Sequence, residues 1–391
     1  MNRREVKRAP VLRFKGFTND WEQRKPGDFL VESKIIGHKG DKAKKLTVKL
    51  WGKGVQEKQD ILSGSANTQY YIRKSGQLMY GKLDFLHAAF GIVPSQLNNY
   101  ESTIDSPSFD VKSANSIFLL NLFLRKKFYL YYGERANGSR KAKRIHEKDF
   151  LVMPIKMPEI NEQNKISNLI EIVNNRITLQ QRKLRLLKLL KKATQQNIFA
   201  STECLPKLKY RNLTGKWQLY RLKDVAKITM GQSPNSKNYT QNPIDHILVQ
   251  GNADIRNGYV FPRIWTTEIT KVANKGDIIL CVRAPAGDVG RTKFNVVIGR
   301  GVAAIKGNDF IFQQLQFMKS SGYWKKYISG STFESINSND IKNAKIFCPS
   351  QLEQKNISSL LDDIDTSIQI QQKNILDFKY IKQFLLQNMF I

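Results

Sequence analysis

Basic side chains gather in one short segment of the first half of the chain, Gly138-Ser-Arg-Lys-Ala-Lys-Arg144. Guanidinium and ammonium groups bind phosphate oxygens, and arginine also pairs with the edge of guanine in the DNA major groove. The glycine and serine that open the segment favour a loop. We therefore expect a nucleic-acid contact through Arg140, Lys141, Lys143 and Arg144, with a solvated loop that binds nothing as the alternative.

A second group of candidates lies where polar residues adjoin aromatic rings or glycine-rich turns. Lys49 and Lys53 flank Trp51, an interleaving of charge and aromatic surface that is typical of proteins that bind nucleic acids. Arg283 and Arg300 stand beside glycine-rich turns, where they are candidates for phosphate or guanine contacts, with structural salt bridges as the alternative. The remaining candidate DNA contacts are Gln232 and Thr332.

No arrangement of residues in the sequence predicts catalysis. Gly76 to Lys82 has the glycine and lysine spacing of a phosphate-binding loop, but Leu83 stands where that loop needs a serine or threonine for magnesium. The 4 histidines are isolated, and the 3 cysteines contain no C-x-x-C pair. We expect no metal site and no disulfide framework, but buried thiols in a reducing compartment. The prediction is a chain without enzymatic activity that binds no cofactor itself.

Composition points to a polyanionic partner. The 391 residues contain 64 Lys and Arg against 33 Asp and Glu, which gives a formal net charge of +31. A hydrophobic content of 41% can supply packed cores, so a disordered basic tail is excluded. No apolar run approaches the roughly 18 residues of a membrane span, and no signal sequence follows the basic N-terminus. We expect a soluble, cytoplasmic protein without a membrane partner.

The chain is internally duplicated. Ten residues between Glu162 and Phe199 recur between Glu353 and Phe390 at a constant offset of 191, and Pro10 to Trp21 resembles Pro206 to Trp217 at an offset of 196. The segments between these anchors barely resemble each other. The sequence therefore predicts two copies of one structural frame, which consists of the matching anchor segments, with a different variable segment in each copy. The predicted parts are a leader (1–21), domain 1 (22–157), helix 1 (158–200), a linker (201–217), domain 2 (218–348) and helix 2 (349–391).

Each half ends in a segment with the 3.5-residue hydrophobic repeat of a coiled coil. In the first half the repeat runs from Ile166 to Ile198, and the second half repeats it 191 residues later. Related units usually associate about a twofold axis, so we expect the two helices to pair antiparallel. Gln180 and Gln371 would then face each other near the midpoint and fix the register, with two solvent-facing glutamines as the alternative.

Most of the positive charge lies outside these helices. Residues 159–200 hold 8 Lys and Arg and 3 Asp and Glu, and residues 350–391 hold 4 and 5. The two segments together carry +4, so +27 of the total charge remains for the two domains and their short leaders. We therefore expect the domains to present the surfaces that meet the polyanion.

The order of these motifs resembles the specificity (S, HsdS) subunits of type I restriction-modification systems. Each variable domain is closed by a Gly-Ser…Ile-x-x-x-Asp stretch, then a proline, a Glu-Gln pair and a long heptad helix, and Gly231-Gln-Ser-Pro234 also matches the family's usual pattern. The resemblance covers nearly the whole chain and implies that each domain reads one half of a bipartite target in double-stranded DNA. It further implies that the helices set the spacer. Two methyltransferase subunits and the restriction subunits would dock on this chain and bring S-adenosylmethionine, ATP and Mg.

The expected fold class is α+β, with two mixed α/β domains in tandem, each followed by a long helix, and the helices paired in an antiparallel coiled coil. Two other functions stay open. A stand-alone sequence-specific or architectural DNA-binding protein would share the charge and the coil, but would not need partner subunits. An enzyme with an undetected motif would cleave or methylate DNA alone.

Overall fold

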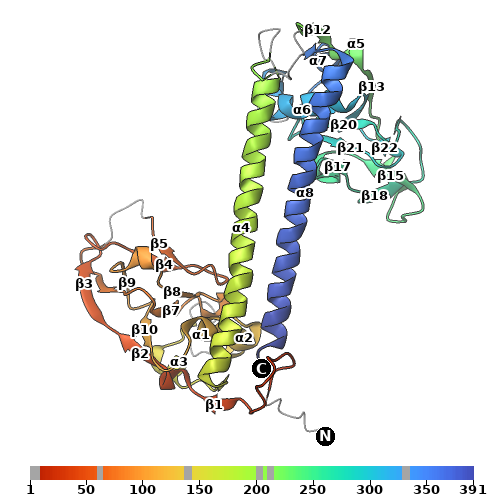
Figure 1. The fold of residues 1–391 in the computed structure, drawn as a ribbon. Coiled ribbons are helices and arrows are strands. Elements are labelled where there is room, and N and C mark those ends of the chain that lie inside the picture. The colour runs from red at the N-terminus through yellow and green to blue at the C-terminus, as the bar shows by residue number, and fades with distance from the viewer. Residues whose placement is uncertain (1–8, 60–64, 136–142, 200–205, 209–214, 328–334) are drawn as a thin grey trace. The chain divides into compact units, whose positions relative to one another are not determined.

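A computed structural model describes residues 9–59, 65–135, 143–199, 206–208, 215–327 and 335–391. The chain forms two compact units, each described here by itself (Figure 1). Unit 1 comprises residues 1–179 and 376–391, and unit 2 comprises residues 180–375. Both unit boundaries fall inside the long helices α4 (Ile160–Ile198) and α8 (Gln351–Asn388). Each long helix therefore contributes residues to both units, and the two helices do not form a separate domain.

Unit 1 contains the first globular domain, which is closed by antiparallel pairing of its first and last strands, β1 and β11. Its main sheet has four antiparallel strands in the order β2-β10-β7-β8, and a second sheet has the order β3-β6-β9. Strands β4 and β5 form a separate hairpin. The elements are β1 (Glu22–Arg24), η1 (Pro26–Asp28), β2 (Leu30–Ser33), β3 (Ile35–Lys39), β4 (Leu46–Val48), β5 (Val55–Glu57), β6 (Gln69–Ile72), β7 (Leu78–Tyr80), η2 (Phe85–His87), β8 (Phe90–Ile92), η3 (Ser95–Leu97), β9 (Glu101–Ser102), β10 (Ser108–Val111), α1 (Ser116–Phe123), α2 (Lys126–Glu134), α3 (Glu147–Leu151) and β11 (Ile155–Met157).

An aromatic core holds the first domain together. Tyr80, Phe90, Phe123 and Phe150 are buried with their ring centroids 4.7–6.4 Å apart in the contacting pairs. Aromatic rings bury large apolar areas, and their tilted and edge-to-face contacts stabilise the core further. The sheet and the short helices of this domain therefore form a rigid base for its loops.

The duplicated Glu-Gln pair ties this domain to the start of α4. The Gln163 side chain donates to the carbonyl of Pro158 at 2.9 Å and accepts from the backbone of Asn115 at 3.0 Å. The Asn115 side chain caps α1 by accepting from the backbone of Ile117 and Phe118. Glu162 is fully buried and accepts two hydrogen bonds from the Arg13 guanidinium. The motif thus joins leader, domain and helix.

Unit 2 contains the second globular domain, closed in the same way by β12 and β24. It has a six-stranded sheet of order β13-β23-β20-β21-β17-β16 and a five-stranded sheet of order β14-β18-β15-β22-β19. The elements are β12 (Gln218–Arg221), α5 (Leu222–Val225), β13 (Lys227–Met230), η4 (Ser236–Asn238), β14 (Tyr239–Thr240), β15 (His246–Val249), η5 (Asn252–Asp254), β16 (Ile255–Arg256), β17 (Tyr259–Val260), β18 (Ile264–Thr266), β19 (Val272–Ala273), β20 (Ile278–Cys281), β21 (Val289–Arg291), β22 (Val296–Ile298), β23 (Val302–Lys306), α6 (Asp309–Ser320), η6 (Tyr323–Tyr327), α7 (Ser338–Lys342) and β24 (Lys345–Cys348).

In the second copy the duplicated Glu-Gln pair also ties domain to helix, but through different donor groups. Gln354 donates to the carbonyl of Pro349 at 3.0 Å and accepts from the side chain of Asn308 at 2.8 Å, and Asn308 caps α6. Glu353 accepts from the indole of Trp217 at 3.2 Å. The duplicated residues therefore belong to the frame, and the different sheets are inserted into it.

The long helices pair antiparallel within each unit. In unit 1, Ile166 and Ile170 of α4 share a buried cluster with Leu385 and Met389 of α8. In unit 2, Ile198 clusters with Ile357, and the ammonium of Lys191 lies 2.6 Å from the carboxylate of Asp365. Residue numbers rise along one helix as they fall along the other in both units. The predicted fold class is confirmed.

The structure brings the two predicted register glutamines together inside unit 2. Gln371 is 3% exposed, and its side-chain amide donates to the backbone carbonyl of Gln180 at 3.1 Å and to the Gln180 side-chain oxygen. A polar pair among apolar heptad positions favours one register over slipped alternatives, at some cost in stability.

The two described cysteines are core residues. Burial raises the pKa of the Cys281 thiol to about 12 and that of Cys348 to about 11. Because the thiolate is the reactive form, we expect iodoacetamide at about pH 8 to leave both residues unmodified in the folded chain. Peptide mass spectrometry measures this, with the guanidinium-unfolded chain as the control in which both react. Modification of either thiol before unfolding would contradict the burial.

No helix in the described ranges has an apolar stretch long enough to cross a membrane.

Candidate nucleic-acid interface

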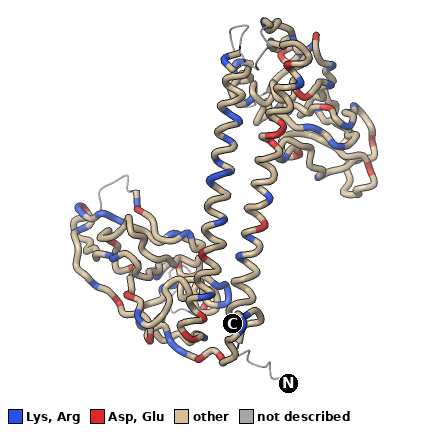
Figure 2. Tube along the Cα trace, in the orientation of Figure 1, with Lys and Arg blue, Asp and Glu red and all other residues tan. Residues whose placement is uncertain are grey.

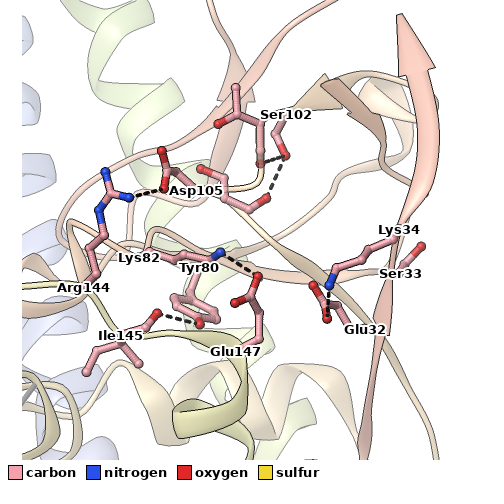
Figure 3. A network of polar contacts seen from close by, with 12 residues as sticks. Glu32, Ser33, Lys34, Tyr80, Lys82, Ser102, Asp105, Arg144, Ile145 and Glu147 are labelled. Atoms are coloured by element: carbon pink, nitrogen blue, oxygen red, sulfur yellow. Dashed lines mark hydrogen bonds and ion pairs between the residues drawn. The ribbon is translucent and has the colours of Figure 1, made fainter. Parts of the chain in front are cut away.

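Of the basic segment 138–144, the structure describes only Lys143 and Arg144. Arg140, Lys141 and Thr332 lie outside the described residues. Lys143 donates to the carbonyl of Glu134, and the guanidinium of Arg144 lies 3.5 Å from the carboxylate of Asp105 (Figure 3). Arg144 and Asp105 are both exposed, and an exposed ion pair contributes little stability. Arg144 can therefore exchange this carboxylate for a phosphate at small cost.

Immediately after Arg144, the chain is anchored in the core. The backbone N–H of Ile145 donates to the carbonyl of Lys82 at 3.2 Å, and the hydroxyl of Tyr80 donates to the carbonyl of Ile145 at 3.0 Å (Figure 3). The Lys82 ammonium lies 2.6 Å from the carboxylate of Glu147, with 6% and 15% of the two side chains exposed. Lys82, the lysine of the phosphate-loop-like spacing, is therefore held in an internal ion pair.

The ion pair lowers the pKa of the Glu147 carboxyl. Burial alone would raise the pKa of Glu147, but the hydrogen bonds from Lys82 and from the backbone outweigh burial and hold that pKa below its ordinary value. The Glu147 carboxylate is thus ionised at neutral pH, and its ion pair with Lys82 fixes the chain just after Arg144.

The two other candidates of the first domain lie on the turn between β4 and β5. The backbone N–H of Lys49 donates to the carbonyl of Gly54 at 2.9 Å, which closes the turn. Lys49 and Lys53 are both exposed. The hairpin therefore presents two cations from a defined turn, as a phosphate contact requires.

In the second domain, Gln232 and Arg300 are brought together although 68 positions separate them in the sequence. The backbone N–H of Gln232 donates to the carbonyl of Ile298 at 2.8 Å, and that of Arg300 donates to the hydroxyl of Ser233 at 3.0 Å. A Cβ on Gly231 would lie 2.1 Å from the carbonyl oxygen of Gly299. Only glycine permits this approach, which leaves two exposed polar side chains on adjacent loops.

Arg283 lies beside the same loops. The backbone N–H of Val282 donates to the carbonyl of Gly301 at 2.9 Å, and Arg283 forms an isolated β-bridge with Ser335. Its side chain is exposed. Arg283, Arg300 and Gln232 thus belong to one cluster of loops at one end of the six-stranded sheet.

Two further residues lie at the base of this cluster and were not predicted from the sequence. The side-chain amide of Gln250 donates to the hydroxyl of Tyr239 at 2.7 Å, and a Cβ on Gly301 would lie 1.9 Å from the carbonyl oxygen of Gln250. Both side chains are half-buried. Strand pairing brings them to the site, and neither belongs to a motif that could have revealed them.

Charge is distributed unequally over the long helices. Figure 2 shows more Lys and Arg along α4 than along α8. The exposed cations of α4 are Lys165, Arg176, Arg182, Lys183, Arg185, Lys188 and Lys192. Among the described residues, no group of three or more His, Cys, Asp or Glu side chains is arranged to hold a metal ion.

Comparison with known proteins gives one consistent result. The family described as "Type I restriction modification DNA specificity domain" matches residues 214–377, which contain the second domain and most of α8. The chain is 28% identical over 327 residues to the type I restriction enzyme MjaX specificity subunit of Methanocaldococcus jannaschii, covering 80% of this chain and 73% of that protein.

Two solved structures show the same fold. One is the S subunit of a type I restriction-modification system from M. genitalium, with a TM-score of 0.65 and 13% identity over 98% of this chain and 99% of that chain. The other comes from a study of complex assembly in a type I restriction-modification system, with a TM-score of 0.58 and 21% identity over 94% and 96%. The first half of the chain repeats the frame of the matched second half, so both halves are similar to the specificity subunits of type I restriction-modification systems.

Proposed function

We propose that this chain is the specificity subunit of a type I restriction-modification system and that each of its globular domains reads one half of an asymmetric, bipartite target in double-stranded DNA. One observation carries the proposal: both domains are closed by an equivalent strand pair, and both are tied to their helix by a hydrogen bond from an asparagine to the duplicated glutamine, while their sheets differ. Two domains that share a frame but differ in their loops can occupy equivalent positions on DNA and still recognise different base sequences.

The candidate contacts divide by chemistry. Lys49, Lys53 and Lys143 are flexible ammonium groups that suit phosphates and so set affinity and salt dependence. Gln232 and Arg300 have the planar, two-pronged groups that pair with adenine and guanine in the major groove. We assign base discrimination in the second domain to the loop cluster that holds these two residues.

The helix pair is the element we propose to set the unread spacer between the half-sites. Helix α4 has 39 residues and would be about 58 Å long at 1.5 Å per residue. This exceeds the roughly 34–36 Å that separates half-sites one turn apart on B-DNA. Because the subunit supplies recognition and no catalysis in this proposal, S-adenosylmethionine, ATP and Mg would be bound by two methyltransferase subunits and by restriction subunits in the cytoplasm.

We further propose that the outer face of α4 docks a methyltransferase subunit. Leu186, Leu189 and Leu190 are each more than half exposed and lie off the stripe that faces α8. Leu189 lines a groove of about 460 Å³ together with Leu184 and the stems of basic residues. Contiguous exposed leucines on a helix mark an interaction surface.

Changing Leu186 and Leu189 to glutamate should weaken capture of the methyltransferase subunit by about 2 kcal/mol, the loss expected for a central interface residue. Titration calorimetry with purified subunits measures the change. Ile244→Glu is the matched control, because Ile244 is a 90% exposed apolar residue of the second domain, in the connection between β14 and β15. Equal affinity of the double variant and the control would exclude this docking face.

The proposed function is tested by co-purification and assay of the tagged chain from its native host. A methyltransferase subunit should accompany the chain, and the purified chain alone should neither cleave nor methylate DNA when given magnesium and S-adenosylmethionine. A chain that emerges alone and still binds DNA specifically would favour a stand-alone DNA-binding protein. Cleaved or methylated product from the chain alone would show an enzyme.

A further inference from the structure

The turn between β4 and β5 exposes a tryptophan at its tip. Trp51 is 59% exposed, whereas Trp21, Trp217 and Trp324 are 2% exposed. The backbone of Trp51 is in the left-handed region, with φ at +61°. Bulky side chains seldom adopt this conformation, because the Cβ then crowds the following carbonyl oxygen.

The surrounding fold holds this unfavourable conformation in place. The backbone N–H of Trp51 donates to the carbonyl of His87 at 2.7 Å, and that of Gly52 donates to the carbonyl of Ala88 at 2.9 Å. A Cβ on Gly52 would lie 2.9 Å from the side chain of Leu124, so the turn sits directly on the helical side of the domain. Strain that a rigid framework maintains tends to mark functional positions.

The environment of the indole is polar and mainly basic. Its ring meets the ring of His87 edge to face, with centroids 5.4 Å apart at 77°, so His87 supports the indole from one side. Lys49 and Lys53 flank the tip, and the carboxylate of Asp84 lies 3.7 Å from the His87 ring as the acidic group beside it. In duplex DNA, an exposed apolar ring can contact the methyl group of thymine in the major groove, and lysines beside it can bind the phosphates.

We propose that Trp51 contacts a base in the half-site read by the first domain, while Lys49 and Lys53 bind the flanking phosphates. The proposal rests on the proposed function and adds a specificity-determining residue to it. The indole has no charge with which to bind phosphate, so its contribution is an apolar contact that depends on the base it meets. The fixed backbone of the turn presents the ring to DNA without an ordering step on binding.

The test compares Trp51→Ala and Trp51→Phe in the full chain assembled with its methyltransferase subunits. Dissociation constants are measured by fluorescence anisotropy over a salt series, for a duplex carrying the recognised sequence and for an unrelated duplex. Trp51→Ala should weaken specific binding roughly ten- to hundred-fold, the loss expected for one misread base pair, and leave the salt slope and non-specific binding unchanged. Trp51→Phe should restore part of the affinity, because it returns an aromatic face.

Two matched controls separate this effect from charge and from general surface change. Lys49→Ala with Lys53→Ala should weaken both duplexes and reduce the salt slope by about one phosphate per lysine. Ile36→Ala removes a 72% exposed apolar side chain from β3 of the same domain and should change neither duplex. Alanine keeps the Cβ at position 51, so the left-handed backbone cost and the melting temperature should stay as in the parent.

The proposal is overturned if Trp51→Ala binds the recognised duplex as tightly as the parent does. It is also overturned if both duplexes are weakened equally, or if the loss follows weaker capture of the methyltransferase subunit. A parent complex that prefers no sequence would refute the proposed function, and the assignment of Trp51 with it. A parent that discriminates while Trp51→Ala discriminates equally refutes the assignment of Trp51 alone.

Discussion

Replacing residues 25–154 with the corresponding domain of another specificity subunit should change one half of the methylated sequence and leave the other half intact. The exchange keeps β1 and β11, whose pairing closes the first domain, and it keeps Gln163 at the start of α4. The donor needs an asparagine equivalent to Asn115, because Asn115 caps α1 and contacts Gln163. Since each mismatched base pair costs about 1–3 kcal/mol, methylation of the parental sequence should be lost completely.

Sequencing that detects methylated bases measures this outcome in cells that carry the hybrid in place of the parent. The reciprocal exchange of the second domain between β12 and β24 is the matched control and should alter the other half only. A hybrid that changes both halves would contradict independent reading by the two domains. Loss of all methylation with normal assembly of the subunits would contradict it as well.

A large loss of stability is expected from Lys82→Ala, although the residue is polar. This change leaves Glu147 largely buried and without its ammonium partner, and breaking a buried ion pair costs about 3–5 kcal/mol. Because 15% of the Glu147 side chain is exposed to water, we expect a loss at the lower end of this range, about 3 kcal/mol in the free energy of unfolding. Denaturant unfolding of the full chain, followed by near-ultraviolet circular dichroism, measures the change.

Lys34→Ala is the matched control, because Lys34 pairs with Glu32 at 2.9 Å while 56% of its side chain is exposed. Its removal should cost well under 1 kcal/mol, as for exposed ion pairs. The cost of Lys82→Ala should also depend on pH. The folded pKa of Glu147 is depressed, so the pair stabilises above the ordinary carboxyl pKa of about 4.3 and is lost as the pH falls through the folded value. A Lys82→Ala cost that is the same in acid and at neutral pH would contradict the ion pair.

The long helices could be predicted from the sequence because their pattern is local and occurs twice. The predicted ranges 158–200 and 349–391 contain α4 and α8 with excesses of a few residues at the ends. The duplication also indicated which residues meet, since it placed Gln180 opposite Gln371. Heptad periodicity and an internal repeat are therefore sufficient to predict pairing between distant segments of a chain.

The sheets inside the domains could not be predicted, because their strands are short and their partners distant. Strand β2 pairs with β10 across more than 70 residues, and β15 pairs with both β18 and β22. Strands of two to five residues carry too little alternation to fix a register. Only the closing pairs β1 with β11 and β12 with β24 fall at the predicted domain limits.

For the candidate interface too, local sequence patterns revealed single residues, but contacts between distant segments could not be predicted. Sequence reasoning selected these residues singly, Arg283 and Arg300 from the glycine-rich turns beside them and Gln232 from the segment 231–234 that resembles the family pattern. It did not predict that they share one cluster of loops, because the close approaches of Gly231 and Gly301 that join these loops are contacts between distant segments. Trp51 was noted only as an aromatic ring between lysines, since its left-handed backbone and its contact with His87 cannot be seen in the sequence.

The central claim is that two unlike domains on one duplicated frame read two separate blocks of DNA. Methylated bases should be mapped in the source genome with this gene present and with it deleted. We expect the deletion to abolish methylation of one asymmetric sequence that has two unlike blocks separated by an unread spacer of constant length. A lost sequence that is continuous or palindromic, or a methylation pattern that the deletion leaves unchanged, would contradict the account.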